Sequence, residues 1–230
     1  MIEGLDALAR VVAEWMVERL GATEGPVAVA LSGGSTPKAL FTLLATAEFA
    51  RQIPWDRVHW CWGDERFVPP DDPSSNYRMA HEAMLSHVPV PPDHVHAIPT
   101  TGLSPAAAAA AYERELRALH GDGDLSRPLF EIVLLGLDTN GHFASLFPDT
   151  PSLTERGAWA TEVTPAGEKT RITLTYPALE SCRHAAFMVA GAEKREALAA
   201  VRAGQADLPA AQYRPAGKLH WFVDDAAAGR

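Results

Sequence analysis

Apolar residues recur along this chain with two different spacings. Residues 2–20 place apolar side chains mostly three or four positions apart, which is the spacing of an amphipathic helix packed against a larger body. Residues 129–135 are an almost continuous apolar run, which is typical of a parallel strand covered on both faces. Segments of these two kinds alternate through the sequence. We therefore predict an α/β fold with a doubly wound, mostly parallel sheet and helices on both faces.

The same spacings predict the individual elements. We expect helices at residues 2–20, 37–50, 75–87, 104–120 and 193–202. We expect strands at residues 26–31, 55–62, 95–98, 129–135, 184–190 and 218–223. Residues 158–164 and 171–176 contain threonines and alternate in polarity, so they indicate a more exposed, antiparallel pair. No internal repeat or long linker divides the sequence, and we expect one domain over residues 1–230.

Composition narrows the possible partners. The formal net charge is −9 and no lysine- or arginine-rich run occurs, so nucleic acid and anionic membranes are not expected partners. Charged residues throughout the first 20 positions exclude a signal peptide or a spanning helix there. The two cysteines, Cys61 and Cys182, lie in or beside apolar segments and are predicted to be buried as small hydrophobes. Together these features indicate a cytoplasmic protein.

A turn rich in Gly, Asp and Asn follows the apolar run 129–135 and leads to His142. Ligands of open α/β sheets bind outside the carboxyl ends of the strands, and His142 lies just beyond such an end. A histidine side chain titrates near neutral pH and can take a proton from water. The segment therefore predicts a general base at His142, with a helix-capping histidine as the alternative.

A second loop, between a predicted strand and the helix predicted to start at Pro37, contains two glycines and three hydroxyl side chains. Its members are Ser32, Gly33, Gly34, Ser35 and Thr36. Glycines let backbone N–H groups approach a ligand, and the helix N-terminus adds partial positive charge, so the loop is typical of phosphate binding. It is neither a Walker A nor a Gly-x-Gly-x-x-Gly loop. A strand-to-helix turn without a ligand is the simpler alternative.

Ser32 permits one rival interpretation, as the nucleophile of an α/β-hydrolase. Residues 30–34 resemble a loosened nucleophile elbow. Alanine replaces the first glycine of that motif, and the 31 residues before Ser32 are too few for the strands and oxyanion loop that precede the elbow. Phosphate binding is therefore favoured for this loop.

Charged residues follow further predicted strands. Asp64, Glu65 and Arg66 come directly after one of them, and Arg66 would suit a phosphate or an oxyanion. Lys194 lies near the start of a predicted helix, where a cation is locally unfavourable, so a ligand would explain it. Arg171 opens a predicted strand. Surface ion pairs and solvated side chains are the alternatives for all of these residues.

Metal binding finds little support in the sequence. His94 and His96 could share one face of a strand, but no Asp, Glu or Cys cluster completes a ligand set at close spacing. His81-Glu82 lacks a second histidine at the position that zinc proteases require. We therefore predict no metal site.

Several blocks of residues together resemble the 6-phosphogluconolactonase family. The blocks are residues 31–37, 62–69, 75–78, 141–148, 171–175, 191–194 and 219–222. The resemblance implies a modified Rossmann-like fold shared with the glucosamine-6-phosphate deaminases. It implies hydrolysis of 6-phospho-D-glucono-1,5-lactone to 6-phospho-D-gluconate in the oxidative pentose phosphate pathway. It also implies that neither a metal nor an organic cofactor takes part.

With this resemblance, the candidate residues form one expected site. We assign catalysis to His142, Asp64 and Arg66, with His142 taking a proton from the water that attacks C1 of the lactone. We assign binding of the phosphate and the sugar hydroxyls to Ser32, Gly33, Gly34, Ser35, Thr36, Arg66, Asn140, Gly141, Arg171 and Lys194. The expected partner is a phosphorylated sugar lactone, and the sequence does not predict an oligomeric state.

Asn140 departs from the family pattern. The family usually has an acidic residue directly before the Gly-His pair, whereas this chain has Asn140 there and Asp138 two residues earlier. An asparagine can hydrogen-bond but cannot offset the charge of a protonated His142. Two outcomes stay open: Asn140→Asp restores a missing carboxylate, or Asp138 already reaches His142 and supplies one.

Two other functions stay open at the sequence level. A deaminase or isomerase of the same fold would use Asp64 to take a proton from C2 of an amino sugar phosphate. Such enzymes resemble Asp-Glu-Tyr at residues 64–66 and Asn-Glu-Pro at residues 146–148, where this chain has Asp-Glu-Arg and Leu-Phe-Pro. The other alternative is a sugar-phosphate-binding protein without activity, and its only support is Asn140.

Overall fold

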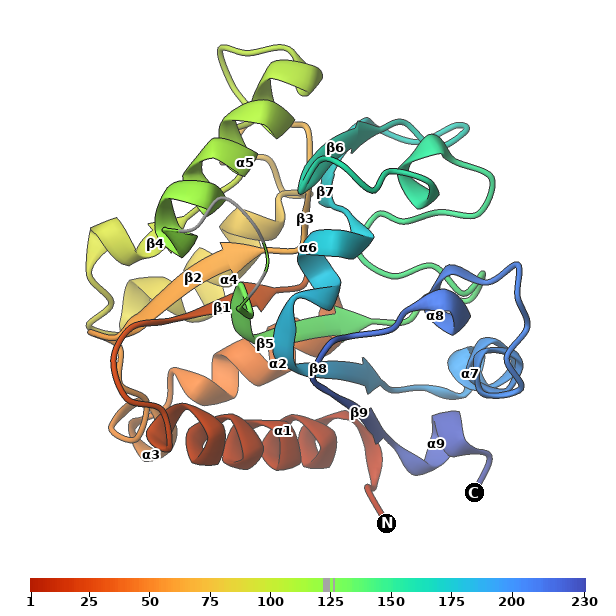
Figure 1. The fold of residues 1–230 in the computed structure, drawn as a ribbon. Coiled ribbons are helices and arrows are strands. Elements are labelled where there is room, and N and C mark those ends of the chain that lie inside the picture. The colour runs from red at the N-terminus through yellow and green to blue at the C-terminus, as the bar shows by residue number, and fades with distance from the viewer. Residues whose placement is uncertain (122–124, 126) are drawn as a thin grey trace.

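The computed structural model describes residues 1–121, 125 and 127–230. Its centre is a sheet of six strands in the order β4-β2-β1-β5-β8-β9 (Figure 1). Each neighbouring pair in this sheet is parallel. In chain order the strands are β1 Val27–Leu31, β2 Val58–Trp62, β4 Val95–His96, β5 Phe130–Gly136, β8 Cys182–Val189 and β9 Lys218–Val223. The predicted doubly wound, parallel architecture is confirmed.

The order of the strands reverses between β1 and β5. From β1 the chain adds β2 and then β4 on one side, and it then returns to β5 and adds β8 and β9 on the other. At this reversal the connections after β1 and β5 diverge, which leaves a crevice at the carboxyl ends of the two strands. The loop 32–36 and the turn that carries His142 both begin there.

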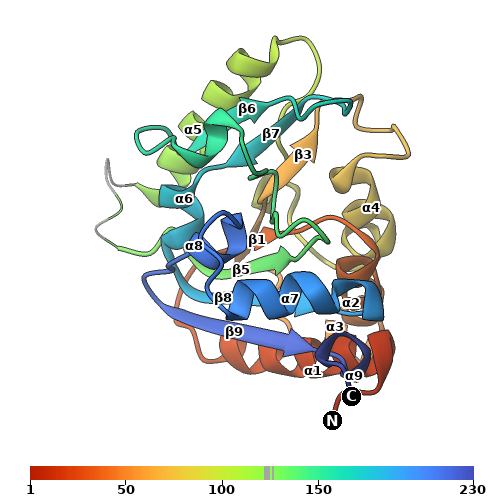
Figure 2. The ribbon, with the colours of Figure 1, turned by 90° about the vertical axis from the view of Figure 1, so that its right-hand side faces the viewer.

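Helices cover both faces of this sheet, as predicted. The described helices are α1 Gly4–Gly21, α2 Ser35–Leu44, α3 Ala47–Ala50, α4 Asn76–Ala83, α5 Pro105–His120, α6 Tyr176–Glu180, α7 Arg195–Arg202, α8 Pro209–Gln212 and α9 Asp225–Ala228. Helices α1 and α2 lie below the sheet, whereas α5 and α6 lie above it with a smaller sheet (Figures 1 and 2). The hydroxyl of Tyr112 on α5 donates to the carbonyl of Trp62 at 2.9 Å, which fixes α5 to the end of β2.

The smaller sheet is antiparallel and has the order β3-β7-β6. Its strands are β3 Asp64–Arg66, β6 Ala160–Val163 and β7 Arg171–Leu174. The antiparallel pair expected from polarity alternation is therefore confirmed, but residues 64–66, which were expected in a loop, form a strand. Their pairing sets Arg66 opposite Arg171 and Asp64 opposite Thr173.

Three predicted helices differ from the observed ones. The expected helix 75–87 ends as α4 at Ala83, and Leu85–His87 form a separate 3-10 turn. The expected helix 37–50 is divided into α2 and α3, and the Thr46 hydroxyl at the N-cap of α3 donates to the carbonyl of Leu43 at 2.7 Å. Helix α2 begins at Ser35 with Gly34 as its N-cap, earlier than the proline suggested. The expected helix 193–202 begins with a 3-10 turn, Ala192–Lys194, so Lys194 lies in that turn and α7 starts after it.

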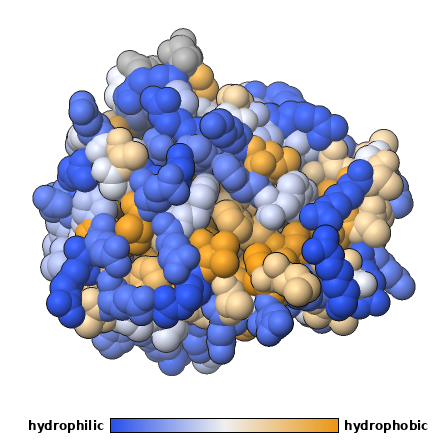
Figure 3. All heavy atoms as spheres, turned by 90° about the horizontal axis from the view of Figure 1, so that it is seen from below, coloured by the Kyte–Doolittle hydropathy of each residue, from blue (hydrophilic) through white to orange (hydrophobic). Residues whose placement is uncertain are grey.

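Burial follows the predicted pattern at the centre of the fold. Cys61 and Cys182 are fully buried, as expected of small hydrophobes. Seen from below, the surface is mostly hydrophilic with apolar patches between charged side chains (Figure 3). Val11 on α1 and Leu219 on β9 are among the exposed large hydrophobic residues. No helix among the described residues is long and apolar enough to cross a membrane.

Candidate active site

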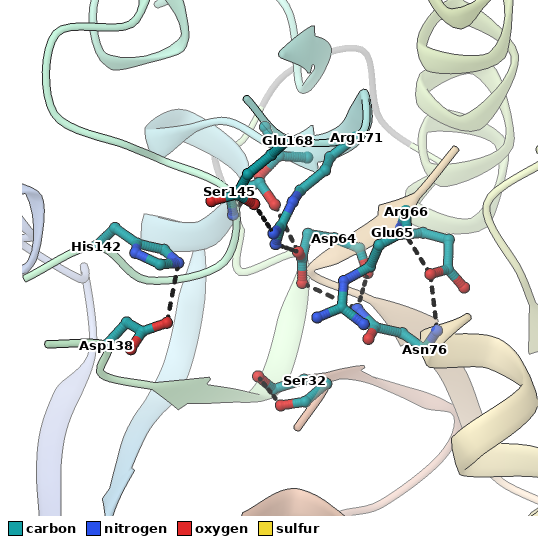
Figure 4. A network of polar contacts seen from close by, with 12 residues as sticks. Ser32, Asp64, Glu65, Arg66, Asn76, Asp138, His142, Ser145, Glu168 and Arg171 are labelled. Carbon is teal, nitrogen blue, oxygen red and sulfur yellow. Dashed lines mark hydrogen bonds and ion pairs between the residues drawn. The ribbon is translucent and has the colours of Figure 1, made fainter. Parts of the chain in front are cut away.

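A cleft of about 210 Å³ lies at the carboxyl ends of β1 and β5. The residues around it come from several segments of the sequence, and Figure 4 labels some of their polar side chains, among them Asp64, Arg171 and His142. The polar and glycine residues that line it are Ser32, Gly33, Gly34, Ser35, Thr36, Asp64, Arg66, Asn76, Gly136, Asp138, His142, Arg171 and Lys194. Many polar groups therefore gather where the strand order reverses, at the carboxyl ends of β1 and β5.

The two glycines of the loop after β1 are each required by the structure, for different reasons. Gly34 has φ 101°, a backbone conformation that strongly favours glycine, and it precedes the first turn of α2. A Cβ on Gly33 would lie 2.0 Å from Oδ1 of Asn76, so this position has no room for a side chain. The N-terminus of α2 therefore faces the cleft closely, as an anion-binding site would require.

Arg66 and Arg171 enter the cleft from the paired strands β3 and β7. Arg66 donates from a terminal nitrogen to the carbonyl of Ser74 at 2.7 Å, and Arg171 forms an ion pair with Glu168. The Nε atoms of both arginines are buried and find no hydrogen-bond partner among the described residues. Buried donors without a partner are unfavourable. Both side chains line the cleft, so their positive charges would favour an anionic ligand there.

The two neighbouring carboxylates of β3 have different environments. Asp64 lines the cleft, accepts a hydrogen bond from the Ser145 hydroxyl at 2.6 Å, and contacts the amide of Asn76 at 3.3 Å. Glu65 points to the opposite side, because successive residues of a strand alternate. Its carboxylate accepts four hydrogen bonds from residues 66 and 75–77. Burial raises the pKa of Glu65 despite these bonds, and its role is to fix the start of α4.

His142 is oriented by Asn140. The Oδ1 atom of Asn140 lies 2.5 Å from Nδ1 of the ring and 3.2 Å from the backbone N–H of His142. The backbone N–H can only donate, so the amide oxygen faces it, and Nδ1 must therefore carry the ring proton. Nε2 of the neutral ring is then the free base. Burial lowers the pKa of His142, and the carboxylates of Asp138 and Asp64 oppose that shift.

Lys194 is tied to Asp138 at the rim of the cleft. Its Nζ donates to Oδ1 of Asp138 at 2.8 Å. Oδ2 of the same carboxylate lies 3.7 Å from Nε2 of His142 (Figure 4). The lysine that the sequence suggested for a ligand therefore has a protein partner as well as a place in the cleft wall.

The expected site residues gather at one place with two exceptions. Asn140 and Gly141 are not among the residues that line the cleft. Asn140 supports the ring of His142, and Gly141 packs closely against Leu208, with φ 76°. Their proposed role in binding substrate stays a prediction, whereas the structure gives them a supporting position.

Comparison with known proteins places the chain in a family. The sequence model described as glucosamine-6-phosphate isomerases/6-phosphogluconolactonase matches residues 3–221. This chain belongs to that family. A curated protein named 6-phosphogluconolactonase from Nostoc sp. is 43% identical over 207 residues, which cover 89% of this chain and 84% of the relative. The protein from Synechocystis sp. with the same name is 41% identical, covering 90% and 85%.

Solved structures give the same family fold. The 6-phosphogluconolactonase from Trypanosoma cruzi matches with a TM-score of 0.86 and 29% identity, covering 99% of this chain and 94% of the other. A monomeric glucosamine-6-phosphate deaminase matches with a TM-score of 0.83 at 18% identity, and that likeness concerns the fold alone. The fold expected from the resemblance to this family is therefore confirmed.

Sequence reasoning missed two members of the cleft network, Asn76 and Ser145, and left the role of Asp138 open. Asn76 lies within a block that carried the resemblance, yet its contacts with Gly33 and Asp64 join segments that no local pattern relates. Ser145 is fully buried and reads in the sequence as one small residue among apolar ones. Asp138 was noticed for its charge, but its link to Lys194 depends on the fold.

Proposed function

We propose that this protein hydrolyses 6-phospho-D-glucono-1,5-lactone to 6-phospho-D-gluconate. The observation that carries the proposal is the position of Nε2 of His142 in the same cleft as the guanidinium groups of Arg66 and Arg171, whose Nε atoms have no hydrogen-bond partner among the described residues. One group can accept a proton from water, and the others can hold an anionic substrate. The family relatives that carry this activity in their names support the same conclusion.

The phosphate of the substrate would bind among the donors of the cleft. The N-terminus of α2, the hydroxyls of the loop 32–36 and the two arginines surround the same space. Charge-assisted hydrogen bonds from guanidinium groups to phosphate oxygens are among the stronger polar contacts in proteins. Fixing the phosphate holds the lactone ring at a set distance from His142, so binding energy remote from C1 lowers the barrier at C1.

The chemical step is general-base hydrolysis of an ester. Nε2 of His142 takes a proton from water while the water oxygen bonds to C1 and the carbonyl oxygen becomes an oxyanion. The oxyanion is stabilised by the cations of the cleft. The bond from C1 to the ring oxygen then breaks, the ring oxygen receives the proton from Nε2, and the product leaves as a carboxylate after losing its acidic proton. Asp64, held by Ser145 and Asn76, is placed to orient Arg171, whose terminal nitrogen lies 4.0 Å away.

The decisive test is lactone decay with and without the purified protein, with spontaneous hydrolysis subtracted. We expect His142→Ala to lower kcat by about 10²–10⁴-fold, the usual effect of removing a general base. His87→Ala is the matched control, because His87 is exposed on the 3-10 turn Leu85–His87. Near wild-type activity of His142→Ala would remove this residue from the mechanism. Ammonia release from glucosamine 6-phosphate would instead assign the deaminase reaction, and binding of 6-phosphogluconate without turnover would indicate a binding protein.

A further inference from the structure

The turn after β5 closes on itself and brings its first and last residues together. The N–H of Asp138 donates to the carbonyl of His142 at 3.0 Å, and the N–H of Gly141 donates to the carbonyl of Asp138 at 2.9 Å. The side chains of Asp138 and His142 line the cleft, and Oδ2 of Asp138 lies 3.7 Å from Nε2 of His142. Asp138 is therefore the carboxylate that faces the proton-accepting atom.

The two oxygens of Asp138 have separate surroundings. Oδ1 accepts hydrogen bonds from Nζ of Lys194 and from the N–H of Thr139, both at 2.8 Å. Oδ2 is the oxygen that faces His142. Two donors on one oxygen fix the carboxylate in orientation, and Lys194 reaches it from the 3-10 turn after β8. The hydrogen bond from Lys194 and the one from Thr139 also help to lower the pKa of Asp138, so this group stays ionised at neutral pH.

The distance from Asp138 to His142 suits the charged ring and not the neutral one. At 3.7 Å the carboxylate oxygen is beyond hydrogen-bond distance from Nε2, so it leaves the lone pair of the neutral base available. Once Nε2 carries a proton, the same distance joins opposite charges. Asn140 cannot provide this charge, because its amide oxygen is neutral and faces Nδ1.

We propose that Asp138, held by Lys194, is the positioning residue that stabilises His142 after it has taken the proton from water. The carboxylate beside His142 thus comes from the start of the turn, with Asn140 providing only the orienting hydrogen bond. This inference rests on the proposed lactone hydrolysis. It adds Asp138 to the residues that act in the reaction, and it gives Lys194 the role of holding Asp138. The proposed function requires neither.

The first test compares pH–rate profiles of the full-length protein and its Asp138→Asn variant. We expect kcat to fall about tenfold, which corresponds to about 1.4 kcal/mol of lost stabilisation, because the Asp138 side chain is half exposed and its charge is screened. An anion raises the pKa of a nearby histidine, so its removal shifts the acidic limb of the profile to lower pH. The other charged groups near His142 are unchanged in this variant: Asp64, Glu168, Arg171 and Lys194.

A rescue variant separates positioning from a structural role. Asn140→Asp added to Asp138→Asn places a carboxylate beside Nδ1 of His142, where the asparagine oxygen now lies at 2.5 Å. We expect this double variant to recover most of the lost kcat and to return the acidic limb to higher pH. Asp56→Asn is the matched control for the change in net charge, since Asp56 is exposed before β2, at the opposite end of the strands. Wild-type kcat and an unshifted limb in Asp138→Asn would overturn the proposal. So would a higher KM with unchanged kcat, which would mean that Asp138 only positions Lys194.

A direct titration keeps this test independent of the proposed function. The His142 ring can be followed by nuclear magnetic resonance and identified among the nine histidines by its absence in His142→Gln. We expect a lower pKa of His142 in Asp138→Asn than in the wild type. If the wild type fails to hydrolyse the lactone but this difference is found, the proposed function is wrong and the pairing of Asp138 with His142 stands. An equal pKa in both proteins refutes the pairing itself.

Discussion

Gly33 shows how one absent side chain organises the cleft. The amide of Asn76 occupies the space where a Cβ of Gly33 would lie, and the same amide contacts the backbone carbonyl and the carboxylate of Asp64. The glycine-containing loop after β1 and the strand β3 are therefore joined through a single asparagine. A change at Gly33 would act on Asp64 without touching it.

We expect Gly33→Ala to lower kcat/KM by about 10²-fold or more, because the new Cβ would displace Asn76 and misplace the loop by a fraction of an ångström to an ångström. Steady-state lactone hydrolysis measures the effect, with circular dichroism to confirm folding. Gly21→Ala is the control, since a Cβ on Gly21 meets no atom within 4 Å. Activity close to wild type in Gly33→Ala would show that Asn76 can move without harm.

Strand β3 explains why adjacent acidic residues differ in role. Because side chains of a strand alternate, Asp64 and Arg66 face the cleft whereas Glu65 faces the start of α4. The sequence could not reveal this division. Three charged residues after a glycine carry no apolar alternation, so their local pattern indicates a turn, and only pairing with β7 makes them a strand.

At the scale of elements, the sequence predicts what the sheet buries. Continuous apolar runs located the central strands, and β9 has the predicted bounds, Lys218–Val223. Helix α5 begins at Pro105, one residue after the predicted start, because Ser104 is its N-cap and proline suits the first helical position. The end of α2 and the start of α3 were not predicted, because the apolar spacing continues across the break.

Ser104 offers an element-scale test of this local signal. Its hydroxyl accepts a hydrogen bond from the N–H of Ala107, which caps α5. We expect Ser104→Ala to lower the free energy of unfolding by about 1 kcal/mol and the melting temperature by about 2–4 °C, with unchanged kcat. Thermal and urea unfolding measure both quantities. The control Ser86→Ala, at an exposed position, should fall within about 0.5 kcal/mol of the wild type, and equal losses in the two variants would argue against the cap.

At the scale of the whole molecule, the candidate site was the harder part to assemble from sequence. Its residues were mostly identified, because most of them follow a predicted strand and carry unusual chemistry for their place. Their mutual contacts were not, since Asn76, Ser145 and Lys194 each meet a partner more than 40 positions away in the chain. Proximity of this kind depends on the strand order, which local periodicity does not determine.

The pairing of β3 with β7 has a consequence for how the protein regains activity after denaturation. The two strands are separated by about 100 residues of chain, so their three-residue pairing closes a large loop for few contacts. Helices form from local contacts and precede such pairings. In dilution from urea, we expect the helical circular dichroism signal to recover faster than lactone hydrolysis, with a transient species that is largely helical but inactive. Simultaneous recovery of both signals would show that β3 and β7 pair together with the rest of the fold.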